Sequence, residues 1–208
     1  MNFDNFVLLF CNGDPPSGER LRKLIPHPSL VACADGGALK AKSSGFEPDI
    51  IVGDLDSLNS AQPDFKNAEI VKIDTQENTD FEKTLNVLIE RGERNILTVS
   101  FSGGRIDQTL ANLQIAYEQS KRSTIILADE DYLLFPLTRI LELDVSPGTD
   151  VSLIAMEDDT HVSTRGLAFE LSDSHLRRGG HGISNRSIGG KVEITVNRGG
   201  IIAFVKHE

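Results

Sequence analysis

Short apolar runs alternate with segments of helical pattern through the first two-thirds of this chain, and this alternation limits the fold more than any other feature. We expect strands at residues 6–11, 30–34, 50–52, 69–73, 96–101 and 124–128, with 133–135 as a possible extension of the last. Strands separated by helices form mainly parallel sheets that carry helices on both faces. Residues 1–137 are therefore predicted to be an α/β domain of Rossmann-like architecture.

The clearest helix is predicted to begin after Thr79 and to end before Gly92. Thr79 and Glu82 form the Thr-x-x-Glu capping box, which satisfies backbone N–H groups of a first helical turn. Apolar residues then recur at helical spacing, at Phe81, Leu85, Leu88 and Ile89. A short helix is expected at residues 38–43. Another follows Gly104, and its predicted apolar face consists of Ile106, Leu110, Leu113 and Tyr117.

The pattern changes near residue 138, after which no long helix is predicted. Short strand-like segments follow at residues 140–143, 150–155, 161–164, 168–171, 191–196 and 201–205. Turn residues separate them, notably Pro147-Gly148 and Gly199-Gly200. Short strands with turns between them are typical of a small β-sandwich or barrel. We therefore expect a second, all-β domain, a sandwich, over residues 138–208.

Composition excludes several classes of function. The chain has 208 residues, 39% of them hydrophobic, and a formal net charge of −10. Nonspecific nucleic-acid binding needs a basic surface, so this charge disfavours it. The longest N-terminal apolar run, at residues 6–11, is too short to span a membrane. We expect a soluble, cytoplasmic protein with no nucleic-acid or membrane partner, in which Cys11 and Cys33 are buried free thiols.

Asp54 and Asp56 follow the predicted strand at residues 50–52. In extended backbone, residues i and i+2 point to the same side, so both carboxylates can face one point. Two carboxylates about 4 Å apart repel by roughly 4 kcal/mol at an effective dielectric constant of about 20. A hard cation such as Mg²⁺, which prefers oxygen ligands, offsets this repulsion. Asp35 and Asp107 also fall at the ends of predicted strands or at helix starts, the edge where open α/β sheets bind ligands.

Asp80 has two interpretations. In the first turn of a helix, an acidic residue complements the helix dipole, which is worth about 0.3–1 kcal/mol. Asp80 could equally serve as a third metal carboxylate, with the side-chain amide of Gln76 offered to the same site.

The segment Ser102-Gly103-Gly104-Arg105 joins a predicted strand to a predicted helix. Paired glycines let backbone N–H groups approach an anion, and a helix N-terminus favours negative charge. Arg105 adds a fork of donors suited to phosphate. Asp107 could hold Arg105 or accept a hydrogen bond from a ligand hydroxyl, and it could equally be a plain helix-start aspartate. Asp35-Gly36-Gly37 has the same form, whereas the sequence contains neither a P-loop motif nor Gly-x-Gly-x-x-Gly.

Five segments, taken in order, resemble the thiamine pyrophosphokinase family. They are ADGGA at 34–38, PDIIVGDLDS at 48–57, QENTDFEK at 76–83, GGRIDQTLAN at 103–112 and GISNR at 182–186. The resemblance implies transfer of the diphosphate of MgATP to the primary hydroxyl of thiamine, which yields thiamine diphosphate and AMP. It also implies a homodimer with active sites between subunits.

By matching position, the resemblance implies roles for named residues. The catalytic residues would be Asp54, Asp56, Asp80 and Arg105, with the three aspartates holding Mg²⁺. The nucleotide site would consist of Asp35, Gly36, Gly37, Gln76, Thr79, Gly104, Asp107 and Gln108. Thiamine would be contacted by Ser184 and Asn185. Two departures stand out: Gln108 occupies a position where many bacterial members have histidine, and the chain lacks the tryptophan that some members stack on thiamine.

Three other functions remain open from the residues alone. A metal-dependent phosphatase of the haloacid dehalogenase type also uses Asp-x-Asp after a strand, and it would form a phosphoaspartate on Asp54. A related pyrophosphokinase could act on another alcohol, such as a pterin. A non-catalytic nucleotide or thiamine sensor could be built on the same fold.

Overall fold

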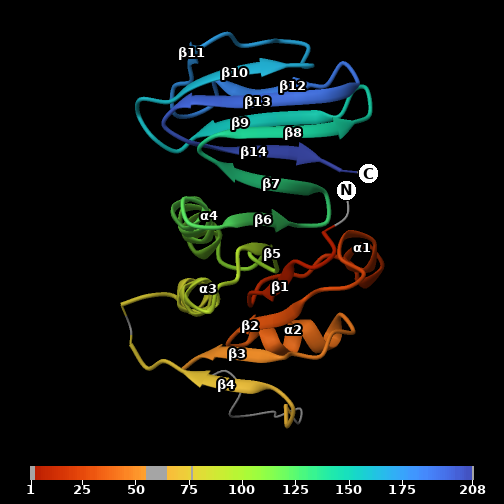
Figure 1. Ribbon diagram of the computed structural model, residues 1–208, viewed down its shortest axis with the longest axis vertical. Coiled ribbons are helices and arrows are strands. Elements are labelled where there is room, and N and C mark those ends of the chain that lie inside the picture. The colour runs from red at the N-terminus through yellow and green to blue at the C-terminus, as the bar shows by residue number, and fades with distance from the viewer. Residues whose placement is uncertain (1–2, 55–64, 76, 208) are drawn as a thin grey trace. The chain divides into compact units, whose positions relative to one another are not determined.

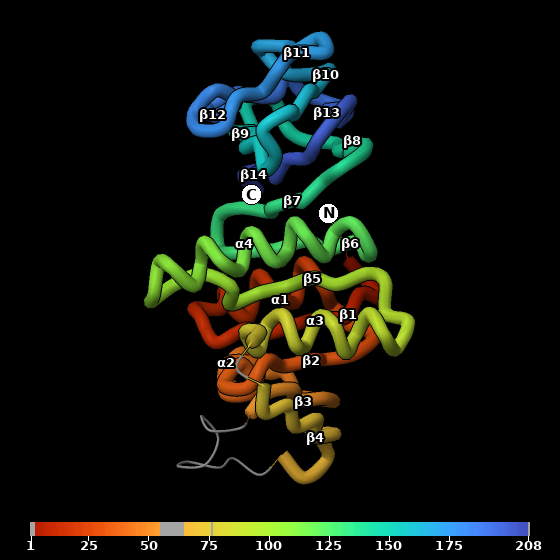
Figure 2. The backbone as a smooth tube through the Cα atoms, turned by 90° about the vertical axis from the view of Figure 1, so that its left-hand side faces the viewer, coloured from red at the N-terminus to blue at the C-terminus, as the bar shows by residue number. Residues whose placement is uncertain are grey.

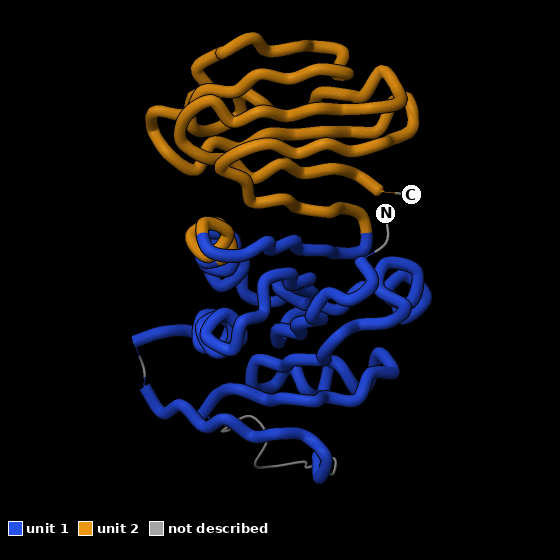
Figure 3. Tube along the Cα trace, in the orientation of Figure 1, with its two compact units in different colours: residues 1–115, 122–130 blue, residues 116–121, 131–208 orange. Residues whose placement is uncertain are grey.

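The computed structural model of the protein describes residues 3–54, 65–75 and 77–207 (Figure 1). The chain divides into two compact units: unit 1 comprises Met1–Ile115 and Arg122–Glu130, and unit 2 comprises Ala116–Lys121 and Asp131–Glu208 (Figure 3). In the described ranges, no helix combines the length and the apolar character needed to cross a membrane.

The described part of unit 1 is built on a parallel sheet with the strand order β6-β5-β1-β2-β3-β4. The strands are β1 (Val7–Phe10), β2 (Leu30–Ala34), β3 (Ile50–Gly53), β4 (Glu69–Lys72), β5 (Asn95–Val99) and β6 (Thr124–Ala128). The chain runs outward from β1 to β4 and then returns to β5 on the other side of β1. Ligands bind such sheets at the carboxyl ends of the strands, where the order reverses.

Helices cover both faces of this sheet (Figure 2). They are α1 (Gly18–Leu24), α2 (Gly37–Ser43), α3 (Asp80–Glu90) and α4 (Ile106–Ser120). The helix α3 packs on β2 and β3, and the unit 1 part of α4 lies on the same side, whereas α1 and α2 lie on the other. The predicted α/β architecture is therefore confirmed, although the short helix α1 was not predicted.

The predicted start and end of α3 are confirmed. The Thr79 hydroxyl accepts a hydrogen bond from the backbone N–H of Glu82 at 3.2 Å, and Gly92 takes a positive φ of 95° just past the helix end. The predicted apolar face of α4 is only partly correct. Tyr117 is buried, but Ile106 is 86% exposed and Leu110 is 59% exposed, because helical spacing identifies a face and not what covers it.

Unit 2 contains two antiparallel sheets with the orders β12-β9-β14-β7 and β11-β10-β13-β8. The strands are β7 (Tyr132–Leu137), β8 (Ile140–Val145), β9 (Asp150–Ala155), β10 (His161–Arg165), β11 (Ser174–His175), β12 (Gly182–Arg186), β13 (Gly190–Arg198) and β14 (Ile201–Lys206). Buried and less buried residues alternate along β9 and through the middle of β13. Each sheet thus buries one face, as a sandwich requires. The predicted β-sandwich is confirmed.

One predicted strand of this half is wrong, and one apolar segment forms a strand of its own where an extension was expected. Residues 168–171 form no strand, and the nearest pairing is an isolated bridge between Leu167 and Ser187. Residues 133–135 do not extend β6 but belong to β7, which pairs antiparallel with β14. Apolar runs of this length do not show which distant strand they will pair with. Cys11 and Cys33 are buried free thiols, as predicted, and burial raises the pKa of both.

Candidate active site

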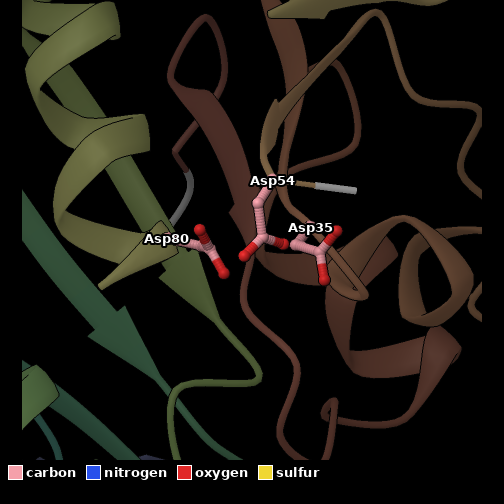
Figure 4. A group of neighbouring side chains, drawn as sticks. All are labelled: Asp35, Asp54 and Asp80. Atoms are coloured by element: carbon pink, nitrogen blue, oxygen red, sulfur yellow. The ribbon is translucent and has the colours of Figure 1, made fainter. Parts of the chain in front are cut away.

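Three aspartates meet at the carboxyl edge of the unit 1 sheet. Asp35 follows β2, Asp54 follows β3, and Asp80 is the first residue of α3. Carboxylate oxygens of all three lie within 4.8 Å of one another, and Figure 4 shows the side chains converging. They line a cavity of about 370 Å³. Such a group of oxygen donors suits a hard divalent cation, which would offset the repulsion between the carboxylates.

Asp35 occupies an unusual position in this cluster. Its side chain is 5% exposed and its φ is 42°, in the left-handed region that aspartate tolerates better than most residues. The Oδ1 atom is buried and has no hydrogen-bond partner among the described residues. A buried acceptor without a partner is costly unless a ligand or cation provides the missing interaction. The unpartnered oxygen is therefore the observation that best fits a bound cation here.

Gly53 has no side chain, and Asp35 occupies the space that a side chain at residue 53 would need. A Cβ atom at residue 53 would lie 2.8 Å from the Cβ of Asp35 and 3.3 Å from its Cα. Both atoms belong to Asp35, the residue directly after β2, and lie on or next to its backbone. They therefore cannot move aside as the end of a flexible side chain would.

Gly53→Ala is expected to destabilise the protein by about 1–3 kcal/mol, because it overpacks the contact between the ends of β2 and β3. Denaturant unfolding measures the effect. Gly180→Ala serves as a control, since the nearest atom to its new Cβ is the side-chain Cδ1 of Ile183, at an ordinary contact distance of 3.6 Å. Equal stability of Gly53→Ala and the wild type would show that the ends of β2 and β3 are not tightly packed.

The first turn of α3 is tied down around Asp80. The Thr84 hydroxyl donates a hydrogen bond to the carbonyl of Asp80 at 2.6 Å. The ammonium of Lys83, one turn along, lies 3.0 Å from Asp80 Oδ1, and its side chain is 5% exposed. A buried lysine is tolerated when an opposite charge is close by. Asp80 is thus held both by its backbone and by its carboxylate.

Arg105 and Asp107 form an exposed ion pair. Arg105 Nη2 lies 2.5 Å from Asp107 Oδ2, and Arg105 Nε lies 3.1 Å from Oδ1. The hydrogen bond from Arg105 lowers the pKa of Asp107 and raises the pKa of Arg105. A carboxyl with a lowered pKa stays charged until the pH falls through that lowered value, so the pair persists at neutral pH. Asp107 thus pairs with Arg105, one of the roles expected for it, and it also lies in the first turn of α4, where a helix-start aspartate was the alternative.

The site residues predicted in the first domain fall into three groups. Those that line the cavity are Asp35, Gly36, Asp54, Thr79, Asp80 and Gln108. Those of unit 1 that lie outside its lining are Gly37, Gly104, Arg105 and Asp107. Asp56 and Gln76 lie outside the described residues. The structure also brings Asp35, which was assigned to the nucleotide site, into the acidic cluster.

Several residues that line the cavity were not assigned a role from sequence: Cys11, Asn12, Asn78, Lys83 and Asn112. Asn12 lies two residues past the end of β1, at the same edge of the sheet as Asp35 after β2, so the rule that ligands bind at the carboxyl ends of strands could have found it. Asn112 lies one turn after Gln108, and its amide donates to the carbonyl of Phe101 at 2.9 Å. No sequence pattern indicated that Lys83 would line a cavity, since a lysine on a helix is usually exposed.

Unit 2 holds the predicted thiamine residues on β12. Ser184 has a positive φ of 63° where the register of β12 against β9 shifts, and its backbone N–H donates to Ser152 Oγ at 3.0 Å. The Asn185 amide accepts from the backbone N–H of Phe169 at 3.1 Å and donates to its carbonyl at 2.7 Å. Phe169 is 74% exposed. A strand irregularity thus accompanies polar groups, one of which holds the backbone of a residue whose aromatic side chain is exposed.

Two family models match the chain. Residues 21–127 match "Thiamin pyrophosphokinase, catalytic domain", and residues 138–201 match "Thiamin pyrophosphokinase, vitamin B1 binding domain". The chain belongs to the thiamin pyrophosphokinase family. As a member of this family it is an enzyme of the transferase class, which confirms the predicted family and enzyme class. A kinase family implies a divalent metal, and the acidic cluster offers a place for it.

Curated relatives and solved structures agree with this assignment. Thiamine pyrophosphokinase 1 of Arabidopsis thaliana is 30% identical, over 92% of this chain and 82% of that protein. Thiamin pyrophosphokinase 1 of Caenorhabditis elegans is 29% identical, over 83% of this chain and 77% of that protein. The fold resembles that of thiamin pyrophosphokinase from Candida albicans with a TM-score of 0.82 at 18% identity, covering 100% of this chain and 92% of that one. The structure of thiamine pyrophosphokinase from Bacillus subtilis gives a TM-score of 0.80 at 19% identity, covering 97% of this chain and 99% of that one.

Proposed function

We propose that this protein transfers the diphosphate of MgATP to the primary hydroxyl of thiamine, forming thiamine diphosphate and AMP. The observation that carries the proposal is the cluster of Asp35, Asp54 and Asp80 around a cavity at the sheet edge, in a chain that both family models match. Family membership supports ATP and thiamine as the substrates.

The reaction is a single displacement. The thiamine oxygen forms a bond to the β-phosphorus of ATP, while the bond from that phosphorus to the oxygen bridging it to the α-phosphorus breaks. AMP leaves with the bridging oxygen, and the hydroxyl proton is released. Positioning of the two substrates and neutralisation of phosphate charge supply most of the rate enhancement in phosphoryl transfer.

We propose Mg²⁺ as the cation. Asp54, Asp56 and Asp80 would hold it, and the unpartnered Oδ1 of Asp35 supports a fourth carboxylate in the same site. Mg²⁺ bound there would neutralise oxygens of the polyphosphate. All the donors are oxygens, which Mg²⁺ prefers to nitrogen or sulfur.

The nucleotide site is proposed to be completed by residues around the same cavity. Gly36, Thr79 and Gln108 line it and could contact ATP, while Gly37 and Gly104 would give backbone N–H groups access to phosphate. Gln76 is assigned to this site from sequence alone. Arg105 would steady the transferred group with Asp107 holding its guanidinium in place.

For thiamine we propose a site on the β-sandwich, in a homodimer whose active sites lie between subunits. Ser184 and Asn185 would contact the vitamin. The exposed ring of Phe169, fixed through its backbone by Asn185, would supply an apolar, π-rich surface for the cationic thiazolium. Residues 1–137 would then bind the nucleotide and residues 138–208 thiamine, and a cytoplasmic location stays a prediction.

Phe169→Ala is expected to raise the KM for thiamine about tenfold, since a stacked aromatic ring is worth about 1 kcal/mol or more to a cation. The KM for ATP should not change. Steady-state kinetics with each substrate varied in turn measures both constants. Ile140→Ala, which removes another exposed apolar side chain (54%) of unit 2, is the control. An unchanged KM for thiamine in Phe169→Ala would remove the ring from the site.

Product analysis tests the function itself. Purified protein with MgATP and thiamine is expected to form AMP and thiamine diphosphate in equal amounts. Formation of ADP, or phosphate release without an alcohol acceptor, would contradict the proposal, and a phosphoaspartate on Asp54 would indicate a phosphatase. A pterin alcohol that serves as the better acceptor would identify a related pyrophosphokinase. Tight MgATP binding with no turnover would indicate a sensor.

A further inference from the structure

Lys83 has hydrogen-bonding capacity that the described residues do not use. An ammonium group carries three N–H donors. Within the part of the chain that the structure describes, the recorded partner of the Lys83 ammonium is Asp80 Oδ1, at 3.0 Å. The side chain is 5% exposed, so bulk water has little access to it. A buried cation with spare donors favours a further acceptor in the adjacent cavity.

Lys83 is also the one cationic side chain among the described residues that line the cavity. It faces three carboxylates, so the cavity stays acidic overall and would repel a polyphosphate unless cations compensate. The other cation considered for phosphate, Arg105, is 70% exposed and bound to Asp107. Lys83 is therefore the better placed of the two to meet an anion inside the cavity.

The position of Lys83 on α3 sets what it can reach. It follows Asp80 by three residues, so both side chains lie on the same face of the helix. A phosphate oxygen held beside the Asp80 carboxylate would lie close to this ammonium, which is 3.0 Å from Asp80 Oδ1. A charge-assisted hydrogen bond to such an oxygen is stronger than one between neutral groups.

We propose that Lys83 is a catalytic residue, whose ammonium binds an oxygen of the diphosphate being transferred while remaining paired with Asp80. This inference rests on the proposed function, since it assigns Lys83 to the reaction at the same site. The competing explanation is structural: Lys83 would only neutralise Asp80 and make no contact with substrate.

Two variants of Lys83 separate these explanations. Lys83→Met removes the charge and keeps most of the apolar stem, and Lys83→Arg keeps the charge. The catalytic role predicts that Lys83→Met lowers kcat/KM for ATP about 100-fold, with the KM for thiamine unchanged, and that Lys83→Arg recovers part of the loss. Lys23→Met is the control, because Lys23 is 74% exposed and pairs with Glu19 at the surface.

An equilibrium measurement keeps the test independent of turnover. Calorimetry with inorganic pyrophosphate and Mg²⁺ is expected to show at least tenfold weaker pyrophosphate binding to Lys83→Met than to the wild type. Unfolding curves check the fold, and replacing a buried charge by methionine need not destabilise it. Wild-type pyrophosphate affinity in a folded Lys83→Met protein would overturn the proposal, and so would a loss of activity that matches the loss of folded protein.

The two proposals fail in different ways. If the wild type makes no AMP from ATP and thiamine, the proposed function is wrong, and pyrophosphate binding still decides whether Lys83 meets a phosphate. If the wild type makes AMP while Lys83→Met retains full kcat/KM for ATP, the function stands and the role of Lys83 is wrong.

Discussion

Asp54→Asn is expected to lower kcat by about a hundredfold or more while leaving the fold intact. The substitution keeps the shape of the side chain but removes one of three carboxylates whose oxygens converge within 4.8 Å. Asparagine is a weaker ligand for a hard cation and carries no charge to hold it. Removal of a charge from the cluster also relieves repulsion, so stability should not fall.

Steady-state AMP release and thermal unfolding together measure this effect. Asp74→Asn is a matched control, because Asp74 is 71% exposed and its carboxylate pairs with Lys72 away from the cavity lining. Near-normal turnover of Asp54→Asn would remove Asp54 from the metal site. A drop in kcat together with a lower unfolding temperature would attribute the loss to folding instead.

Mg²⁺ is expected to stabilise the wild-type protein against unfolding, and its removal by a chelator should abolish turnover. A ligand that binds only the folded state at 100 times its Kd adds about 2.7 kcal/mol to the free energy of unfolding. The three carboxylates repel one another without a cation, so the gain should be concentrated at this site. Thermal unfolding across a series of Mg²⁺ concentrations measures the shift.

The control for general salt effects is NaCl at matched ionic strength, since screening alone changes surface electrostatics. Asp54→Asn should lose most of the Mg²⁺-dependent stabilisation. An equal shift in the variant and the wild type would place the stabilising cation elsewhere on the protein.

Much of the fold could be predicted because it follows from local patterns. The strands at β2, β6 and β9 were predicted with their observed bounds, since each is a compact apolar or alternating run between turn residues. The strand β12 was missed because its glycine and polar residues, on a mostly exposed edge, show no hydrophobic alternation. The segment at 168–171 was predicted wrongly because it is rich in apolar residues, yet Ala168 and Phe169 are exposed and the segment joins no ladder.

Sequence alone determined the alternation of strands and helices in the first part of the chain and the aspartates that follow the strands. Both depend on short-range periodicity and on the glycine and capping residues that end each element. Only the tertiary structure decided which of these side chains meet. Asp35 joins Asp54 and Asp80 because β2 lies between β1 and β3 and because α3 packs over β2 and β3. The same packing buries Lys83, while Arg105 stays outside the cavity lining with Asp107. Sheet order and helix docking result from long-range burial of apolar surface, which no local pattern encodes.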